Sequence, residues 1–593
     1  MARWLFRWVR LLFAVAVVSV LVTGQPRADS LDLSPNLPSH QPVGTRIVWT
    51  ASATAPATSK YQFSIAHETG DYVIVRDFQD VNAFSWTPLD EGVFSIRVVA
   101  RAGLTRVERV APFTIVSRTT GSRAVVTTTS HPLVALYNVP PCSEGKRVFV
   151  ELAEEASFSW TRTSTKDCVA DRSLSFYVAG MRPQQTYWMR HAVTEGFVTL
   201  RSQVTQFTTG SSPITMPGME VLDPPDLETS SREAVVLHAV LDAARPTSNF
   251  PIATDLAGRL IWYYDRLAVR GTFAYVTRPV PGGSMLMLAA CCNGRDHVLV
   301  EIDLAGNTIR QTPMSRINEQ LRARGDEAVR ALHHDAVRFP NGQTLVLGML
   351  ERSGVLPDQP MLADMVIALD ANLQVAWTWN AFDHLDTSRA AVLNENCLAA
   401  YGAACAASSP FAHDWLHSNS LAYAPADGNL IISMRHQDWI VKVDYRDGMG
   451  SGDVIWRLGQ DGDFTVVSQD PHPWFSHQHD ASYINPTTIA VYDNGNTRCA
   501  NAEGSCNSRG QVYALDEARG IATLRVNADL GVYSDRLGSA QQLSNGNFAF
   551  GSGSVEARFS DLTELGAGSG ATFGLRAGIA AYRTLRLRSM YEY

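Results

Sequence analysis

The sequence has few features of a nucleic-acid-binding protein or of a protein that spans a membrane. Lys and Arg occur 50 times against 58 Asp and Glu, the formal net charge is −8, and the basic residues form no clusters. Because such a surface repels nucleic acid, we expect no nucleic-acid partner. The longest apolar run, Leu11–Val22, has about a dozen residues, whereas a spanning helix needs roughly 20.

The first 28 residues have the pattern of an export signal. Three arginines within the first ten residues precede the apolar run, and small residues at Gly24 and Ala28 offer cleavage sites. The pattern is typical of a secretory signal peptide over residues 1–28, which predicts a periplasmic or secreted protein. An uncleaved membrane anchor is the alternative, since Trp4–Val22 is nearly long enough to span a bilayer.

None of the eight cysteines has the CxxC spacing of a metal-binding knuckle. In an oxidising compartment, closely spaced cysteines in even number predict short-loop disulfides. Three pairs fit this reading, namely Cys142/Cys168, Cys397/Cys405 and Cys499/Cys506. Their formation implies contact with the disulfide-forming machinery of the exporting compartment. The adjacent Cys291 and Cys292 fit either a vicinal disulfide or two thiols.

Two small β-sandwich domains are predicted in the first third of the chain. Residues 29–118 contain short strands that alternate apolar with polar residues between Gly, Pro and Asp turns, as in immunoglobulin-like sandwiches. Residues 119–212 look similar, and MRPQQTYWMRHAV (181–193) resembles the turn and tyrosine of fibronectin type III modules. A proline-containing linker then leads to the main domain.

Residues 219–593 contain an internal repeat of roughly 40–70 residues. Several segments share one form, in which a strand ends in Asp and a turn leads to a strand that often carries Trp or Tyr. IATDLAGRLIWYYD (252–265) and MVIALDANLQVAWTW (365–379) are examples, and only residues 316–332 look helical. The repeat predicts an all-β fold in which a six-bladed β-propeller follows the two sandwiches.

The histidines are concentrated within this repeat. Nine of the fifteen lie between His333 and His479, at the edges of strand units that begin near residues 332, 413 and 477. Repeated units with the same side-chain type at the same point can bring those side chains to one centre. We therefore expect histidines and one arginine to line the propeller axis.

The order of the motifs resembles the bacterial-type, nucleotide-independent aryl sulfotransferase family. The resemblance is carried by HHD (333–335), DWLHSNS (414–420), SMRHQ (433–437), QHDA (478–481), YDNGNTR (492–498), GSAQQLSNGN (538–547) and YRTLRLRSMY (582–591). It implies transfer of a sulfuryl group from an aryl sulfate ester to a phenolic acceptor. The implied mechanism is ping-pong through an N-sulfohistidine, without a cofactor or a metal.

The resemblance also implies roles for individual residues. Four are implied to be catalytic: His479 as nucleophile, His417 as general acid and base, Arg435 and His334. Three are implied to bind substrate: Asn419, His333 and Asn494. For Asn494, a turn residue or an acceptor that orients a histidine ring is an equal alternative. Either His333 or His334 faces the axis, because adjacent strand residues point in opposite directions. Asp480 departs from the family pattern, which has a small or hydroxyl residue after the nucleophile.

Elementary chemistry favours this set of side chains. A neutral imidazole can attack the sulfur of an anionic ester without charge repulsion, and a guanidinium can bind two sulfuryl oxygens at once. Two alternatives stay open. His477 and His479, with His413 or His417, could hold a metal. A secreted propeller without catalysis could instead bind carbohydrate or protein. A homodimer is a further possible assembly.

Overall fold

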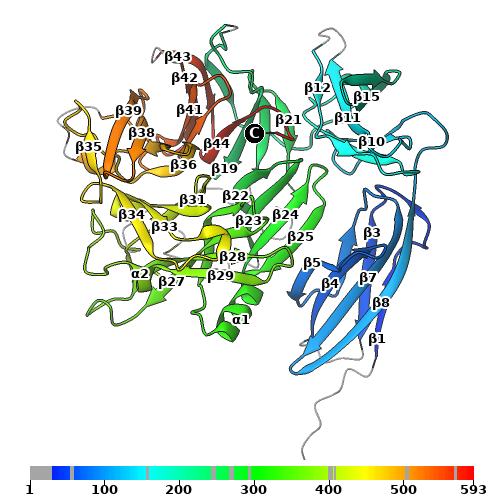
Figure 1. The fold of residues 1–593 in the computed structure, drawn as a ribbon, viewed down its shortest axis with the longest axis horizontal. Coiled ribbons are helices and arrows are strands. Elements are labelled where there is room, and N and C mark those ends of the chain that lie inside the picture. The colour runs from blue at the N-terminus through cyan, green and yellow to red at the C-terminus, as the bar shows by residue number, and fades with distance from the viewer. Residues whose placement is uncertain are drawn as a thin grey trace, which may run out of the picture.

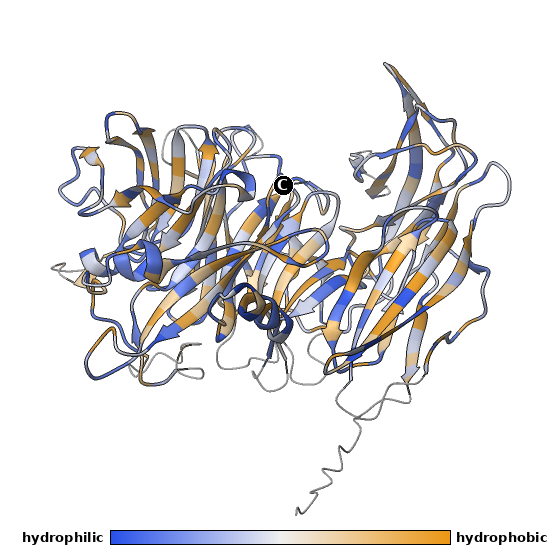
Figure 2. Cartoon of the chain, turned by 60° about the horizontal axis from the view of Figure 1, so that its bottom comes forward, coloured by the Kyte–Doolittle hydropathy of each residue, from blue (hydrophilic) through white to orange (hydrophobic). Residues whose placement is uncertain are grey.

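The computed structural model describes residues 30–592 except 54–58, 155–158, 227, 242–248, 266–272, 292–295, 398–404, 406–408, 501, 503–505 and 567–569. The export signal expected over residues 1–28 lies outside this range. Within it, no helix combines the length and the hydropathy that a membrane span requires. Figure 1 shows two small β-units beside a larger body of strands, and Figure 2 shows that hydrophobic residues follow the strands of all three.

The first unit is a sandwich of two sheets. One sheet contains β1 (Leu31–Pro35), β3 (Ile47–Ala53) and β6 (Ala83–Trp86). The other contains β2 (Gln41–Pro42), β8 (Thr105–Val116), β7 (Gly92–Ala102), β4 (Lys60–His67) and β5 (Val73–Gln79). Alternate residues point inward, so Trp49, Phe63 and Phe113 fill the space between the sheets.

The second unit is also a sandwich. Its smaller sheet contains β9 (Val125–Thr128), β10 (Ala135–Val139) and β14 (Leu174–Val178). Its larger sheet contains β11 (Arg147–Glu154), β12 (Thr161–Arg162), β13 (Lys166–Asp167), β15 (Thr186–Glu195), β16 (Val198–Arg201) and β17 (Thr205–Thr208). Tyr137 and Tyr187 lie in its core.

Both sandwiches are packed against the larger body. β5 pairs in parallel with β25 (Thr308–Pro313) at Arg76 and Gln311, which joins one sandwich sheet and one blade into a nine-stranded sheet. In the second sandwich the carbonyl oxygen of Tyr177 accepts a hydrogen bond of 2.9 Å from the hydroxyl of Tyr591. These contacts hold the sandwiches against the first two blades.

The larger body is a propeller of six antiparallel blades. From the inner strand outward, the first two are β44 (Ala581–Leu587), β19 (Val235–Val240), β20 (Ile252–Asp255) and β21 (Leu260–Tyr263), then β22 (Phe273–Val280), β23 (Ser284–Cys291), β24 (Asp296–Asp303) and β25. The next two are β26 (Ala331–Arg338), β27 (Thr344–Arg352), β28 (Met361–Leu369) and β29 (Val375–Asn380), then β31 (Ser418–Ala424), β32 (Asn429–Met434), β33 (Trp439–Val443) and β34 (Val454–Gly459). The last two are β36 (His479–Asn485), β37 (Thr488–Asp493), β38 (Arg509–Asp516) and β39 (Ile521–Asp529), then β40 (Ser539–Gln542), β41 (Phe548–Val555), β42 (Phe559–Leu565) and β43 (Ala571–Ala577).

The inner strands form a closed ring. β44, β22, β26, β31, β36 and β40 contact one another in this cyclic order. Because β44 is the last strand of the chain and pairs with β19, the first blade is built from both ends of the propeller sequence. Three short strands extend the blades: β18 (Met219–Asp223) on β43, β30 (His413–Asp414) on β28, and β35 (Thr465–Val467) on β39.

Short helices connect some strands: α1 (Met314–Arg324), α2 (Ala381–His384), α4 (Asn496–Ala500) and the 3₁₀ turns η3 (Arg435–Gln437) and η4 (Arg446–Gly448). The helix expected over residues 316–332 is shorter than predicted. It ends at Arg324 because Gly325 has a φ of 88° and caps it in the left-handed conformation, and β26 begins at Ala331.

Two of the three expected disulfides are present, Cys142–Cys168 and Cys499–Cys506. The prediction was wrong for Cys397 and Cys405, which are buried free thiols that hydrogen-bond to each other. Sequence proximity does not fix whether two sulfurs bond, because that depends on the direction of both side chains. The question of a Cys291–Cys292 bond lies outside the described residues. Two disulfides favour an oxidising compartment.

Candidate active site

Three neighbouring inner strands begin with histidines at the same face of the propeller. His333 and His334 lie at the start of β26, His417 precedes β31, and His479 begins β36. The pairing of each strand with its neighbour is interrupted at this point by a β-bulge. His334 and His417 have φ values of 56° and 52°, which are unusual for residues other than glycine. The bulges therefore redirect side chains toward the axis.

The imidazole rings form one cluster. The ring centroids of His334 and His417 are 4.5 Å apart, and those of His417 and His436 are also 4.5 Å apart. The ring of Tyr582 on β44 joins this cluster, because its centroid lies 5.7 Å from that of His334 and 6.3 Å from that of His479. Side chains from four blades thus meet at one place.

His334, rather than His333, faces this cluster. His333 is buried in its blade, where its Nε2 lies 3.1 Å from Oδ1 of Asp364 without hydrogen-bond alignment. Its Nδ1 lies 2.7 Å from Nδ1 of His334. Burial holds the pKa of His334 well below its ordinary value, and the neighbouring His417 lowers it further. His334 is therefore a neutral ring at physiological pH.

His417 has a carboxylate partner. Its Nδ1 lies 2.7 Å from Oδ2 of Asp414, and its side chain is 22% exposed. Burial alone would raise the pKa of Asp414, but His417 and His436 hold it well below its ordinary value. The ionised carboxylate accepts a hydrogen bond from Nδ1–H of His417 and leaves Nε2 of that ring for other contacts.

His479 has an amide partner instead. Its Nδ1 lies 2.7 Å from Oδ1 of Asn494, and both residues are buried. Burial holds the pKa of His479 well below its ordinary value, and the positive charge of Arg435 lowers it further. The ring is therefore neutral. Of the roles that the sequence suggested for Asn494, the contact with this ring agrees with an acceptor that orients a histidine.

Arg435 begins the turn η3 and is held by two acceptors. Its Nη1 lies 2.6 Å from Nε2 of His436, and its Nη2 donates to the carbonyl oxygen of Asp535 at 3.1 Å. Nδ1 of His436 lies 2.7 Å from the carbonyl oxygen of Asp414 and must donate to it, so Nε2 accepts from Arg435. Among the described residues, the buried Nε of Arg435 has no hydrogen-bond partner.

Asn419 ties two inner strands together beside the cluster. Its Nδ2 donates to the backbone carbonyl oxygen of Gln478 at 2.7 Å. The backbone carbonyl oxygen of Asn419 accepts from the hydroxyl of Tyr582 at 2.7 Å. Its buried Oδ1 has no partner within the described part of the chain. This expected substrate-binding side chain is fully buried, next to His479 in the ring of strands.

A cluster of four charged residues that the sequence did not indicate lies at the axis: Arg278, Asp335, Asp480 and Arg583. They come from four different inner strands. Arg583 lies 3.0 Å from Asp335 and 2.8 Å from Asp480, and Arg278 lies 2.8 and 2.9 Å from the same two carboxylates. Asp335 and Asp480 therefore bind arginines, although each is next to a histidine in sequence. Two features of the sequence could have indicated this cluster: the arginines of YRTLRLRSMY (582–591) and the His-Asp-Ala triplet that occurs at 334–336 and again at 479–481.

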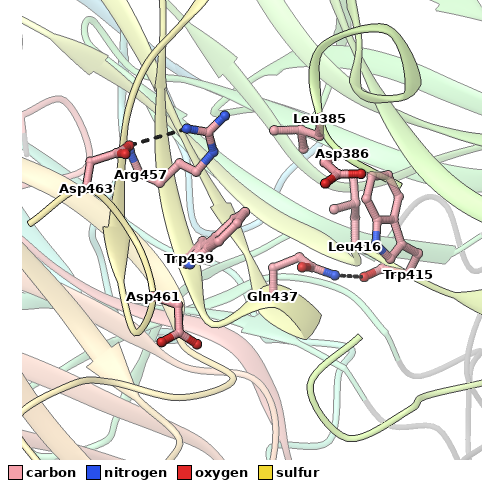
Figure 3. A pocket seen from close by; sticks show the side chains of 9 residues that line it. All are labelled: Leu385, Asp386, Trp415, Leu416, Gln437, Trp439, Arg457, Asp461 and Asp463. Atoms are coloured by element: carbon pink, nitrogen blue, oxygen red, sulfur yellow. Dashed lines mark hydrogen bonds and ion pairs between the residues drawn. The ribbon is translucent and has the colours of Figure 1, made fainter. Parts of the chain in front are cut away.

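Figure 3 shows a cavity of about 260 Å³ that lies between elements of the third and fourth blades. Its wall includes Trp415 and Leu416, which directly precede His417, and Gln437, which follows His436. Trp439 at the start of β33, Arg457 and three aspartates complete the polar and aromatic lining. Leu385 after α2 and Arg457 on β34 place this cavity at the outer strands of the third and fourth blades, and none of the site histidines lines it.

The histidines proposed for a metal site do not form one. His477 contacts Glu395 through Nε2 and lies 2.9 Å from Asp438 through Nδ1, away from His479. Asp414, His417 and His436 have potential ligand atoms within 4.8 Å of one another. Both ring nitrogens of His436 are engaged, however, and the Arg435 guanidinium beside them disfavours a cation. The group of Asp414, His417 and His436 therefore fits an anion better than a metal ion.

Comparison with known proteins gave one family. The family model described as "Arylsulfotransferase (ASST)" matches residues 226–571, more than half of the chain. No curated protein matches the sequence. Among solved structures, the chain is similar to the chicken interferon gamma receptor alpha chain, with 10% identity, 30% of this chain and 98% of that chain covered, and a TM-score of 0.13. It is also similar to a two-domain fibronectin type III segment of chicken tenascin, with 16% identity, 31% and 98% covered, and a TM-score of 0.14.

Proposed function

The chain belongs to the arylsulfotransferase family, and we propose on this premise that it transfers a sulfuryl group from an aryl sulfate ester to a phenolic acceptor in two steps through His479. The observation that carries the proposal is that three groups lie at one face of the propeller. They are the neutral buried ring of His479, the ring of His417 bound to a carboxylate, and the guanidinium of Arg435, whose Nε has no hydrogen-bond partner among the described residues. These are the nucleophile, the proton carrier and the anion-binding group that the reaction needs.

In the first step a ring nitrogen of His479 attacks the sulfur of the donor. A nitrogen–sulfur bond forms as the bond from sulfur to the phenolic oxygen breaks, and His417 gives its proton to the departing phenolate. In the second step the acceptor phenol loses its proton to His417 and attacks the same sulfur, which frees His479. This order is ping-pong, because the first phenol leaves before the second reacts.

Asp414 supports the role of His417. An ionised carboxylate 2.7 Å from Nδ1 stabilises the imidazolium and directs Nε2 outward. His417 is also the more exposed of the two rings, with a side chain that is 22% exposed. A proton carrier that meets both donor and acceptor needs this access.

Arg435 supports binding of the sulfuryl oxygens. The described residues leave its buried Nε without an acceptor, and a buried unpaired donor is costly unless a ligand satisfies it. An anionic oxygen would be such an acceptor. We place His334 beside His417 as a neutral hydrogen-bond donor, since their ring centroids are 4.5 Å apart. Asn419 holds the strands on which these groups lie.

The test is incubation with 4-nitrophenyl sulfate, first alone and then with phenol. We expect a burst of nitrophenolate in the first case, sustained release in the second, and a sulfuryl adduct on the peptide that contains His479. The variant His479→Asn should fold and release no nitrophenolate. Turnover near the wild-type rate in this variant would exclude His479 as nucleophile, and no release by the wild type would favour a binding propeller.

We propose that the enzyme is exported, because its two disulfides would form and persist in an oxidising compartment. The pattern of residues 1–28 supports the same conclusion. Cell fractionation followed by N-terminal sequencing tests it, and a cytoplasmic protein that begins at Met1 would contradict it.

A further inference from the structure

The side-chain amide of Asn494 has one fixed orientation. Its Nδ2 donates to the carbonyl oxygen of Ser534 at 2.7 Å and to that of Leu537 at 2.9 Å. Because a carbonyl oxygen can only accept, the amide nitrogen must be the atom that faces these two groups. The remaining atom, Oδ1, then faces the ring of His479 at 2.7 Å.

This orientation determines the tautomer of His479. An amide oxygen only accepts, so Nδ1 of His479 must carry the proton, and the lone pair of the neutral ring lies on Nε2. We infer that Asn494 is a positioning residue that makes Nε2 of His479 the attacking atom, and that it does so through an acceptor that carries no charge. The inference rests on the proposed function and adds to it the identity of the reacting nitrogen.

The two central histidines differ in the charge of their partners. His417 has the carboxylate of Asp414, and His479 has the amide of Asn494, although the two hydrogen bonds are both 2.7 Å long. A carboxylate stabilises an imidazolium, whereas an amide adds no charge that would favour protonation. A charged partner for His417 and an uncharged partner for His479 assign the two rings different roles, the first as proton carrier and the second as nucleophile.

The remaining groups that act on His479 reinforce this difference. Burial and the charge of Arg435 are the main causes of its lowered pKa, and His417 and Arg583 lower it further, whereas the hydrogen bond to Asn494 raises it. His334 also interacts with this ring. All four groups are cations or can become cations, so the amide of Asn494 is the partner that a substitution can convert into an anion.

The variant Asn494→Asp makes that conversion with almost no change of shape. The new carboxylate raises the pKa of the ring, and a protonated ring has no lone pair, so the rate is lost at low pH and returns as the pH rises. We expect the acid limb of the nitrophenolate burst to move upward by about one to three pH units. The variant Asn494→Leu, which removes the acceptor without adding charge, should lower the burst rate by a similar factor at every pH.

Asn485→Asp is the matched control. It makes the same chemical change at the exposed far end of β36, roughly 20 Å along the strand from His479. This control should leave the pH profile unchanged. If Asn494→Asp lowers the rate equally at every pH, or not at all, Asn494 has only a structural role and the inference is wrong.

Two measurements separate this inference from the proposed function. A sulfuryl adduct on His479 in the wild type, combined with an unmoved acid limb in Asn494→Asp, would overturn the inference and leave the proposed function intact. The ¹⁵N resonances of His479 in histidine-labelled protein report the tautomer without any turnover. We expect Nδ1–H in the wild type, and an Nε2–H tautomer would overturn the inference even in an inactive protein.

Discussion

The charged cluster at the propeller axis gives the sharpest prediction about stability. Arg583 is 1% exposed and donates to Asp335 at 3.0 and 3.2 Å, to Asp480 at 2.8 Å and to the carbonyl oxygen of Asn419 at 2.9 Å. The variant Arg583→Met keeps much of the side-chain volume but removes the charge. Two buried carboxylates then share Arg278 alone.

Loss of one partner from a buried ion pair costs about 3–5 kcal/mol, because a charge stays buried without compensation. We expect the free energy of unfolding of Arg583→Met to fall by this amount near neutral pH. An exposed pair gives the comparison: Arg259 is 57% exposed beside Asp255, so Arg259→Met should cost at most about 1 kcal/mol.

The pH dependence of the stability loss in Arg583→Met shows whether the loss comes from the missing charge or from altered packing. Burial alone would raise the pKa of Asp335, but Arg278 and Arg583 hold it below its ordinary value. In the wild type this contribution is therefore present at neutral pH and is lost as the pH falls through the lowered pKa. In Arg583→Met a carboxylate takes up a proton at higher pH, which removes the penalty. The difference between variant and wild type should shrink from about pH 7 to about pH 4.5.

Urea unfolding followed by tryptophan fluorescence measures these differences. The double variant Arg583→Met with Asp480→Asn removes one charge of each sign and should recover at least half of the lost stability. If the double variant recovers nothing and the cost of Arg583→Met is the same at both pH values, the loss comes from packing and our account of the cluster is wrong.

Two further predictions concern the proposed chemistry. Asp414→Asn removes the charge behind His417 and should slow turnover by about 10²–10⁴-fold with phenyl sulfate but much less with 4-nitrophenyl sulfate, whose leaving group needs little protonation; equal losses with both donors would contradict a general-acid role. His436→Phe removes an acceptor of Arg435 and should raise the KM for the donor about tenfold or more, because a hydrogen bond to a charged group contributes about 1.5–3 kcal/mol; an unchanged KM would show that Arg435 needs no such support.

Local patterns in the sequence were sufficient to predict the two sandwiches and the six blades, because strand alternation and turn residues are local properties. Features that depend on distant parts of the chain were not accessible in this way. The pairing of β5 with β25 joins residues more than two hundred positions apart. The length of the first helix also differed, since one left-handed glycine ended it seven residues before β26.

The site shows a similar limit. The motifs identified the histidines that meet at one face, but sequence adjacency did not identify their partners. Asp335 and Asp480 each follow a histidine directly and bind arginines, whereas Asp414 lies three residues before His417 and binds its ring. The reason is the bulged backbone: at His334, His417 and Asp480 a positive φ turns successive side chains away from the alternation of an ordinary strand.

The same C-terminal strand completes both the fold and the site. Tyr582 lies under His334 and His479, and the next residue, Arg583, joins the carboxylates of two other blades. Because the charge of Arg583 also lowers the pKa of His334 and His479, the ion pairs that close the ring help to keep both rings neutral. Stability and the charge state of these rings therefore depend on one guanidinium, so Arg583→Met should also favour protonation of His479.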